Sequence, residues 1–583
     1  MMKHYTDERS QQIVLALLKA HGIRKVVASP GTTNVTLVGS MQNDSWFEMY
    51  SCADERSAAY LAVGLAEESG EAVVLTCTGA TASRNYLPGL TEAYYRKLPV
   101  LAITANQGRE KVGNLVAQNV DRSSVPNDVV KLSVNLPVCK DKDDEWNVNL
   151  SVNKALLELR RNGGGPVHMD LATAYSTDFS VKELPSERVI SRYAVTDELP
   201  PMPEGRRTVV FVGSHSRWSD SQVRALDSFC ASNDAVVLCD HTSGYNGKYK
   251  VGFSLVAGQD SYKSELLKVG LLIHVGEVSG DYYTMRIRPD KVWRVSPDGE
   301  VRDTFRRLTK VFEMPEEFFF SHYSAASCKS DPLLDMYRKE CAKVHAALPE
   351  LPFSNIWMAK TASRMIPSGS VLHFGILNSL RAWNFFDLPA SVETCANVGG
   401  FGIDGIISSI VGAAIAAPDK MFFGILGDLA FFYDMNVLGN RHVPSNVRIM
   451  MVNNGKGTEF RNYGHVCHQW GDEADGYMAA AGHYGSRSSE LVRHYAEDLG
   501  YGYMCASSKE EFNDRIERFL DKNAFDRPVI LEVFTESELE SKALEMTLNA
   551  FVDKSHVVKK QIRGAMADAL GEGVVRKIEG LLK

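Results

Sequence analysis

Two polar segments in the last third of the chain have the residue types of a metal site. Gly427-Asp428-Leu429 follows the apolar run 421–426, and Asn453-Asn454-Gly455-Lys456 follows the apolar run 447–452. The spacing from Asp428 to Asn454, 454 − 428 = 26 residues, leaves room for a helix near 431–440 and a returning strand. Because the carboxyl ends of adjacent parallel strands meet at one edge of a sheet, we expect Asp428 and Asn454 to lie together.

The chemistry predicted for this pair is the binding of Mg²⁺ beside a diphosphate. A carboxylate, an amide oxygen and a backbone carbonyl are hard ligands that Mg²⁺ accepts, with phosphate oxygens and water completing an octahedron. The N-terminus of a helix after Asp428 would add unpaired N–H groups at the same place. A strand-end Asp and an Asn-Gly turn are each ordinary alone, but both in this order and spacing favour the metal site.

A second candidate is Glu55, at the junction between a predicted strand over 47–52 and a predicted helix over 57–68. A carboxylate there is commonly only a helix-start residue, favoured by the helix dipole, and this alternative stays open for Glu55 taken alone. The helix carries small residues that permit close packing. The next predicted strand, 73–77, leads into Thr78-Gly79, a turn suited to contacting a ring or a phosphate.

The elements that would position these groups alternate between short apolar strands and helices in three regions. The predicted strands are 25–28, 47–52, 73–77, 100–104 and 167–171 in the first region, 209–212, 236–238, 271–275 and 292–295 in the second, and 371–374, 421–426, 447–452 and 529–533 in the third. This alternation predicts an α/β fold of three domains, each a mostly parallel sheet flanked by helices.

We place the domains at 1–183, 184–345 and 346–550, followed by a helical tail at 551–583. Residues 184–204 are rich in Pro, Ser and charge and are predicted to be a linker. The middle region has Gly213-Ser-His-Ser at its first turn instead of GxGxxG, which argues against a bound dinucleotide. The tail has apolar residues at helical spacing, so we expect it to pack on the body or on a partner subunit.

The composition excludes several classes of protein. The chain has 583 residues, with 64 Lys+Arg against 72 Asp+Glu and a net charge of −8, so nothing favours a nucleic-acid or anionic-membrane partner. No apolar run is long enough to span a bilayer, and the N-terminus does not resemble a secretory signal. Ten cysteines without a CxxC pair argue against a disulfide framework or a zinc cage. We expect a cytoplasmic protein.

The strand-end glutamate, the Thr-Gly turn and the GD…NN motif together resemble the thiamine diphosphate-dependent superfamily of 2-oxoacid decarboxylases and acetolactate synthases. The resemblance covers nearly the whole chain, in the order pyrimidine-binding, central and diphosphate-binding domain. The segments Ser29-Pro30-Gly31, 54–59, 402–409 and 427–436 resemble more closely the menaquinone-pathway synthase family, which adds a succinyl unit from 2-oxoglutarate to isochorismate. The resemblance implies thiamine diphosphate and Mg²⁺ as cofactors. It also implies a homodimer or homotetramer, since the two outer domains of the superfamily face each other across a subunit boundary.

The resemblance also implies residue roles. Glu55 would hydrogen-bond the aminopyrimidine, and Gln118 would lie near the reacting centre. The further cofactor contacts would be Thr78, Gly79, Phe401, Ile403, Gly427, Asp428, Leu429, Asn454 and Lys456. Asp428, Asn454 and the Lys456 carbonyl would hold Mg²⁺, and the substrate would meet Ser29, Thr32, Ser379, Arg381 and Glu459. Ile403 would prop the bent cofactor. The alternatives are plain core packing for Ile403 and a surface-loop amide for Gln118.

Three departures from the family pattern concern the substrate. Thr33, Gln107 and Val398 stand where the menaquinone-pathway family has arginines. Each missing guanidinium removes charge-assisted bonds of about 1.5–3 kcal/mol to a carboxylate. We therefore expect decarboxylation of a 2-oxoacid and transfer of the acyl carbanion equivalent to an acceptor less anionic than isochorismate. The alternatives are simple non-oxidative decarboxylation, a flavin-dependent acetolactate-type enzyme and a non-catalytic subunit.

Overall fold

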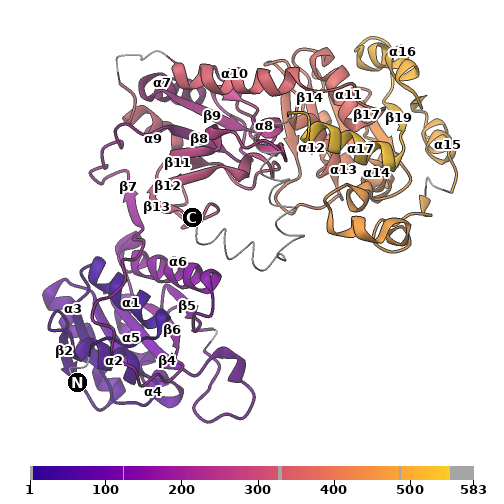
Figure 1. The fold of residues 1–583 in the computed structure, drawn as a ribbon. Helices are drawn as coiled ribbons and strands as arrows, with labels where there is room; N and C mark the ends of the chain where they lie inside the picture. The colour runs from indigo at the N-terminus through magenta and orange to yellow at the C-terminus, as the bar shows by residue number, and fades with distance from the viewer. Residues whose placement is uncertain (1–3, 123, 326–330, 485–486, 552–583) are drawn as a thin grey trace, which may run out of the picture. The chain divides into compact units, whose positions relative to one another are not determined.

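The structure is a computed structural model that describes residues 4–122, 124–325, 331–484 and 487–551. It divides into two compact units, one of Met1–Glu198 with Asp298–Glu313 and the other of Leu199–Pro297 with Met314–Lys583. Figure 1 shows the helices and strands of each. The helix predicted for the tail lies outside the described residues from 552 onward. Within the described residues, no helix is long and apolar enough to cross a membrane.

The first unit is built on a six-stranded parallel sheet in the order β2-β1-β3-β4-β6-β5. Its strands are β1 (Lys25–Ala28), β2 (Glu48–Ser51), β3 (Val73–Thr78), β4 (Val100–Asn106), β5 (Leu132–Leu136) and β6 (Val167–Ala172). Its helices are α1 (Arg9–Ala20), α2 (Val35–Gln42), α3 (Glu55–Ser69), α4 (Ala80–Asn85), α5 (Leu87–Tyr95) and α6 (Lys142–Glu158).

Both faces of this sheet are buried at its central strands β3 and β4, which explains why these two strands are nearly continuous apolar runs. On one face Val26, Val74 and Ile103 pack under α1, α2 and α6. On the other face Val27 and Leu75 pack under α3 and α5. The alternation follows from the two-residue period of a strand, so neighbouring side chains enter different cores.

The middle region contributes strands in the order β10-β9-β8-β11-β12 to the second unit. These are β8 (Thr208–Val212), β9 (Ala235–Cys239), β10 (Lys250–Val251), β11 (Lys268–Val275) and β12 (Arg288–Val295), with helices α7 (Asp220–Asn233), α8 (Ser254–Gly258), α9 (Glu316–His322) and α10 (Pro332–Ala346). Helix α7 begins with a capping box between Ser219 and Gln222.

The last region of the second unit has a parallel sheet in the order β15-β14-β16-β17-β19-β18. The strands are β14 (Val371–Phe374), β15 (Glu393–Ala396), β16 (Phe422–Gly427), β17 (Val447–Asn453), β18 (Gly502–Ala506) and β19 (Val529–Phe534). The helices are α11 (Asn355–Ala362), α12 (Asn378–Asn384), α13 (Ile406–Ala416), α14 (Asp428–Asp434), α15 (Leu491–Asp498), α16 (Lys509–Leu520) and α17 (Ser537–Leu548).

The predicted α/β fold with three mostly parallel sheets is confirmed, and each predicted strand overlaps an observed one. Most bounds agree within one or two residues, but β11 and β12 begin three and four residues earlier than predicted. The linker predicted over 184–204 is wrong in part, because β7 (Ser191–Ala194) lies inside it and pairs in parallel with β13 (Leu308–Glu313) of the same unit. All four residues of β7 are only half buried. The strand therefore lacks the apolar run or the alternation by which a sequence shows a strand.

Candidate active site

The two metal-type segments lie side by side at one edge of the last sheet. Strands β16 and β17 pair in parallel, with Leu426 opposite Met451 and Gly427 opposite Val452. Asp428 and Asn454 therefore leave neighbouring strands at the same carboxyl edge, as the spacing predicts. Helix α14 begins at Asp428 itself, three residues earlier than expected, and continues into a short 3-10 segment, Met435–Gly439.

Asp428 is a buried carboxylate with no cation beside it in the described chain. Its two oxygens accept hydrogen bonds from the backbone N–H groups of Leu429 at 2.8 Å and Gly455 at 2.7 Å. Burial nevertheless raises the pKa of Asp428 to about 6, because these backbone donors offset only part of the desolvation. The carboxylate would be stabilised by a positive charge at this position.

Asn454 supplies the second oxygen. Its side-chain Oδ1 is buried and has no hydrogen-bond partner among the described residues. The neighbouring Asn453 is fixed by Glu532, whose Oε1 accepts from Asn453 Nδ2 at 2.6 Å. Gly455 adopts a left-handed φ of 74°, which a glycine reaches without strain. A buried acceptor left without a donor costs free energy, so a cation ligand accounts for Asn454 Oδ1 better than the protein does.

A cavity of about 120 Å³ opens beside these oxygens. Its lining includes Ile403, Gly427, Asp428, Asn454 and Lys456. A Cβ atom built on Gly427 would meet no protein atom within 4 Å, so the space next to this glycine is open to a ligand. Buried carboxylate, unpartnered amide oxygen and open glycine fit Mg²⁺ and a diphosphate.

Phe401 and Ile403 lie on the loop that precedes α13. Phe401 has a left-handed φ of 52°, uncommon for a residue with a side chain, and its ring contacts Tyr282 at 5.5 Å between centroids. Ile403 is half buried, packs against the core of the last sheet and also lines the cavity. Its two interpretations, core packing and cofactor contact, are therefore compatible.

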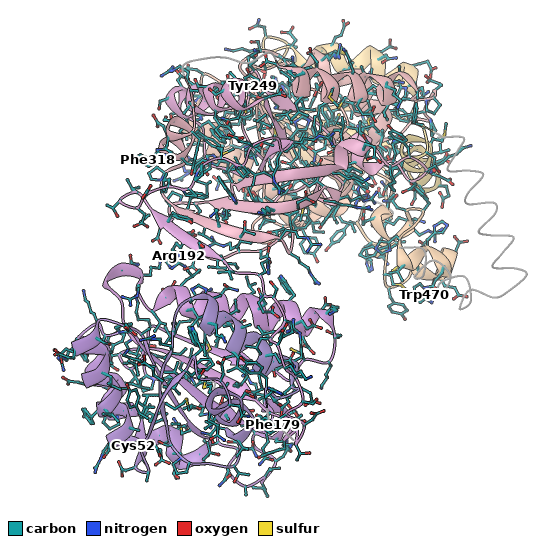
Figure 2. All side chains as sticks on the ribbon, turned by 60° about the vertical axis from the view of Figure 1, so that its left-hand side comes forward. Cys52, Phe179, Arg192, Tyr249, Phe318 and Trp470 are labelled. Atoms are coloured by element: carbon teal, nitrogen blue, oxygen red, sulfur yellow. The ribbon has the colours of Figure 1, made fainter. Side chains whose placement is uncertain are left out.

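The predicted Glu55 lies at the first position of α3 in the first unit. Asp54 caps the helix, its side chain accepting from Ser57 N at 2.7 Å. Figure 2 labels Cys52, which follows β2 just before this turn. Glu55 is half buried. Burial and, to a smaller extent, the charge of Glu55 raise the pKa of Cys77 to about 12, so Glu55 lies within electrostatic reach of Cys77 in β3.

Other predicted residues of the first unit meet at the ends of β1 and β3. Ser29 is buried and lies directly after β1, and a Cβ atom on Gly31 would come within 2.6 Å of Thr78. A Cβ atom on Gly79 would approach the backbone oxygen of Gln118 to 3.1 Å. The structure therefore brings Ser29, Thr78, Gly79 and the Gln118 backbone together. Thr32 and the Gln118 side chain are exposed.

The predicted substrate residues Arg381 and Glu459 bind each other. Arg381 donates through Nη1 and Nη2 to the two carboxylate oxygens of Glu459, both at 2.8 Å, and to Asn378 Oδ1 at 3.0 Å. The pair is mostly buried, with side chains 14% and 18% exposed. Ser379, two residues before Arg381 on α12, lines the cavity beside Asp428 together with Glu459. The guanidinium of Arg381 is therefore not free to bind a substrate carboxylate.

Two of the three residues that stand where the family has arginines are buried in the protein. Thr33 is 2% exposed and its hydroxyl donates to the backbone oxygen of Ala105 at 3.1 Å, with Thr78 Oγ1 also in contact. Val398 is likewise 2% exposed. Lys456, the one basic residue lining the cavity within the described chain, pairs with Asp475 at 2.7 Å.

Three residues that hold parts of the candidate site in place were not predicted from the sequence. Glu532 positions Asn453, and Asp434 accepts from Ser408 N and Ser408 Oγ, both at 2.6 Å. Glu540 lines the cavity and accepts from Asn355 N at 2.9 Å. Asp434 lies in a segment that the resemblance already covers, so it could have been found. Glu532 and Glu540 carry no motif.

Comparison with known proteins agrees with this geometry. Residues 9–125 match the family described as thiamine pyrophosphate enzyme, N-terminal TPP binding domain. Over 564 residues the chain is 31% identical to the 2-succinyl-5-enolpyruvyl-6-hydroxy-3-cyclohexene-1-carboxylate synthase of Bacteroides thetaiotaomicron, covering 93% of this chain and 98% of that protein. The synthase of the same name from Phocaeicola vulgatus is 30% identical, covering 94% and 100%.

A solved structure similar to the chain is the thiamine diphosphate-dependent 4-hydroxybenzoylformate decarboxylase of Rhodococcus jostii RHA1. It is 18% identical, covers 90% of this chain and 99% of that one, and has a TM-score of 0.38. The family match and the two synthases show that the chain is a thiamine pyrophosphate-dependent enzyme. Within this class it belongs to the family of the 2-succinyl-5-enolpyruvyl-6-hydroxy-3-cyclohexene-1-carboxylate synthases.

Proposed function

We propose that the protein decarboxylates a 2-oxoacid and joins the resulting acyl unit to a small acceptor, using thiamine diphosphate and Mg²⁺. The observation that carries the proposal is the buried Asp428 carboxylate beside the unpartnered Asn454 Oδ1, in a chain of this family. Residues 1–183 would bind the pyrimidine and residues 346–550 the diphosphate. Residues 184–345 would form a central domain between them.

Thiamine diphosphate, when bound, supplies the electron sink that decarboxylation requires. Asp428 Oδ2, Asn454 Oδ1 and the Lys456 carbonyl would hold Mg²⁺, and the open space at Gly427 would admit the diphosphate. Ile403 would press on the cofactor from the cavity wall. Glu55 would hold a proton at its carboxyl group and share it with the pyrimidine ring, the usual work of a positioned carboxyl group.

We propose further that the acceptor is not isochorismate and carries fewer negative charges. The guanidinium of Arg381 is occupied by Glu459, and the ammonium of Lys456 by Asp475. The Thr33 hydroxyl is bonded to the protein backbone. A carboxylate brought into this cavity would have to compete with Glu459 for Arg381, whereas an acceptor hydroxyl or carbonyl would meet uncharged polar side chains of its lining such as Asn378 and Ser379.

We propose a homodimer at least, with each site shared by two subunits. Exposed apolar side chains lie on the helices that begin with the functional carboxylates. Tyr60 and Leu61 on α3 are 48% and 42% exposed, and Tyr433 on α14 is 64% exposed. Apolar groups of this size beside a site favour a protein partner.

We propose a cytoplasmic location. The nine described cysteines are free, in keeping with a reducing compartment.

The test is a product analysis. The purified chain, loaded with thiamine diphosphate and Mg²⁺, is given a panel of 2-oxoacids, and CO₂ release is measured with and without candidate acceptors of ketone, aldehyde and sugar type. A coupled product in the mass spectrum supports the proposal. An aldehyde as the only product would instead establish simple decarboxylation, and no CO₂ release from any acid, with the cofactor bound, would favour a non-catalytic subunit.

Asp428→Ala is the matched control for this assay. It removes the proposed metal ligand at the same cavity, so CO₂ release should disappear with it. Activity that survives this change would mean that the chemistry takes place elsewhere.

A further inference from the structure

A second and larger cavity of about 720 Å³ lies in the second unit. Its walls are the turn and short strand around β10, helix α10, the end of α11 with the 3-10 turn Ser363–Met365, and the segment after α12. It is lined by Asn246, Gly247, Lys248, Lys250, Val251, Gly252, Arg338, Cys341, Ala342, His345, Leu348, Lys360, Ser363, Arg364, Phe386, Asp387, Leu388 and Ala390. None of these residues lines the cavity at Asp428.

Basic side chains dominate this lining. The lining contains five Lys and Arg side chains but only one carboxylate, that of Asp387, although the chain as a whole has a net charge of −8. Lys248 is paired with Asp331 at 2.6 Å. Among the residues that the structure describes, no carboxylate lies within ion-pair distance of the other four, Lys250, Arg338, Lys360 and Arg364. A concave cluster of unpaired cations concentrates positive potential and attracts anions.

The cations converge from different elements on one place. His345 on α10 lies within the electrostatic reach of Asp387, Arg364 and Lys360, and its pKa is lowered by burial, with the two cations adding to this effect. Helix α10 therefore faces both the loop after α12 and the end of α11 across the cavity. In Figure 1 α10 runs along the top of the middle region, above β8 and β9.

The floor of the cavity is held in place by the protein's own bonds. Arg338 Nη2 donates to Lys248 O at 2.7 Å, and Lys250 Nζ donates to Asn246 Oδ1 at 2.7 Å. Gly247 is closely packed, since a Cβ atom there would overlap Tyr245 and Asp227. Figure 2 labels Tyr249, which belongs to the same turn. A turn fixed in this way is organised before a ligand arrives, which lowers the cost of binding.

One wall is apolar. Phe386 is 8% exposed, and its ring lies 5.9 Å from that of His345, centroid to centroid. Leu348 and Val251 complete this wall. The cavity volume is within the range of sites that enclose a whole small molecule. Its ligand would therefore combine several negative charges with an uncharged, flat or apolar part.

We propose that this cavity binds a multiply charged phosphorylated small molecule of the nucleoside polyphosphate kind, at a site separate from the thiamine diphosphate site. Lys360 and Arg364 from the α11 side and Arg338 from α10 would contact the phosphates. Phe386 and His345 would face the uncharged part. The inference rests on the geometry of this cavity and does not depend on the proposed reaction.

The test is a calorimetric titration of the full chain, saturated with thiamine diphosphate and Mg²⁺ so that the other site is filled. The probes are ATP, inorganic triphosphate and citrate. We expect saturable binding of ATP and triphosphate that weakens as salt rises, and weaker binding of citrate. Lys360→Ala combined with Arg364→Ala should weaken ATP binding at least tenfold, while Arg224→Ala, an exposed arginine on α7 outside the cavity, should leave it unchanged.

Three results would overturn the proposal: no saturable binding of either phosphate probe, an equal loss in the Arg224→Ala chain, or citrate binding as tightly as triphosphate. The melting temperature of the double variant shows whether it folds. A repeat with Asp428→Ala and no thiamine diphosphate separates this site from the other one. ATP affinity retained in that chain supports the assignment, and affinity lost there shows that the probe was binding at Asp428.

Discussion

Three buried carboxylates near the candidate site differ in the partner that would stabilise each of them, because their neighbours differ. Asp428 faces the unpartnered oxygen of Asn454, so a cation is the partner that would satisfy both. Glu532 accepts from Asn453 and from Tyr503, at 2.6 and 2.8 Å, and is held by neutral donors. Glu540 accepts from the backbone N–H of Asn355, and burial raises its pKa to about 7 although this bond opposes the shift. We infer that Glu540 binds a proton near neutral pH.

Glu540→Gln should therefore change the pH dependence of stability. The folded-state pKa of about 7 lies above the ordinary 4.5, so the stability associated with this group is present below pH 4.5 and is lost as the pH rises through 7. The shift corresponds to about 3 kcal/mol at pH 8. Relative to the unchanged chain, the melting temperature of the glutamine variant should rise between pH 5 and pH 8.

Glu538→Gln is the matched control, because Glu538 lies on the same helix and its side chain is 68% exposed. It should show no such trend. A Glu540→Gln chain whose melting temperature runs parallel to that of the unchanged protein across this pH range would mean that Glu540 is ionised throughout.

Glu55→Gln should abolish most catalysis and leave cofactor binding nearly intact. The amide keeps the size and the helix-start position of Glu55 but cannot exchange a proton, so kcat should fall by about 10²–10⁴-fold. Steady-state kinetics give kcat, and calorimetry gives the affinity for thiamine diphosphate. Glu68→Gln, an exposed change at the far end of the same helix, should alter neither quantity. Unchanged kcat in the Glu55→Gln chain would remove Glu55 from the mechanism.

For single residues, the sequence predicts the site best where a residue of suitable chemistry directly follows a recognisable strand. Asp428 and Asn454 follow two apolar runs, and their juxtaposition could be predicted because parallel strands fix it. Glu540 could not be predicted, because its partner Asn355 lies 185 residues away and no local pattern marks a buried glutamate on a helix. Arg381 and Glu459 could each be named, but their pairing could not.

Among the elements, the contact between α13 and α14 connects two parts of the candidate site. Asp434, at the end of α14, accepts two hydrogen bonds from Ser408 in the first turn of α13. Ile403 and Gly405 lie just before α13, and Asp428 begins α14. One carboxylate therefore connects the loop that carries Ile403 to the helix that begins at Asp428.

Asp434→Ala should weaken thiamine diphosphate binding by about tenfold, since the loss of charge-assisted bonds worth about 1.4 kcal/mol frees the loop before α13. The affinity is measured by calorimetry in excess Mg²⁺. Asp419→Ala removes an exposed carboxylate just after α13 and should have no effect. Equal affinities of the Asp434→Ala and unchanged chains would show that the loop is held without this contact.

Most central strands could be predicted from the sequence, whereas the edge strands, apart from β2, could not. Strands β3, β4, β16 and β17 are buried on both faces, so they are continuous apolar runs. By contrast β5, β15 and β7 are mostly half buried and lie at or near sheet edges, where packing demands little of the sequence. Their positions depend on pairing with distant strands, which no short window of sequence contains.

On the scale of the whole molecule, the first and last sheets have one topology. Numbered within each sheet, both follow the order 2-1-3-4-6-5. The third strand leads to Thr78-Gly79 in one sheet and to Gly427-Asp428 in the other. The fourth leads to Asn106 and to Asn453, respectively. The two halves of the candidate site therefore occupy equivalent edges of two equivalent sheets, a relation that no repeat in the sequence reveals.

Equivalent edges suit a site assembled from two sheets, and the dimer we propose would take one from each subunit. This can be decided by mixing two inactive chains. A homodimer of the Glu55→Gln chain and a homodimer of the Asp428→Ala chain would each contain no intact site. In a mixed dimer, however, one of the two shared sites would receive an intact Glu55 from one subunit and an intact Asp428 from the other.

Co-expression of the two chains under different affinity tags should therefore restore activity. Random pairing makes half of the dimers mixed, and each mixed dimer has one intact site, so about a quarter of the unchanged enzyme's activity per dimer is expected. After purification through both tags the value should rise to about half. A site built within a single chain would give no recovery in either preparation, because each chain then lacks one of the two groups. Activity of doubly tagged dimers thus distinguishes a shared site from a self-contained one.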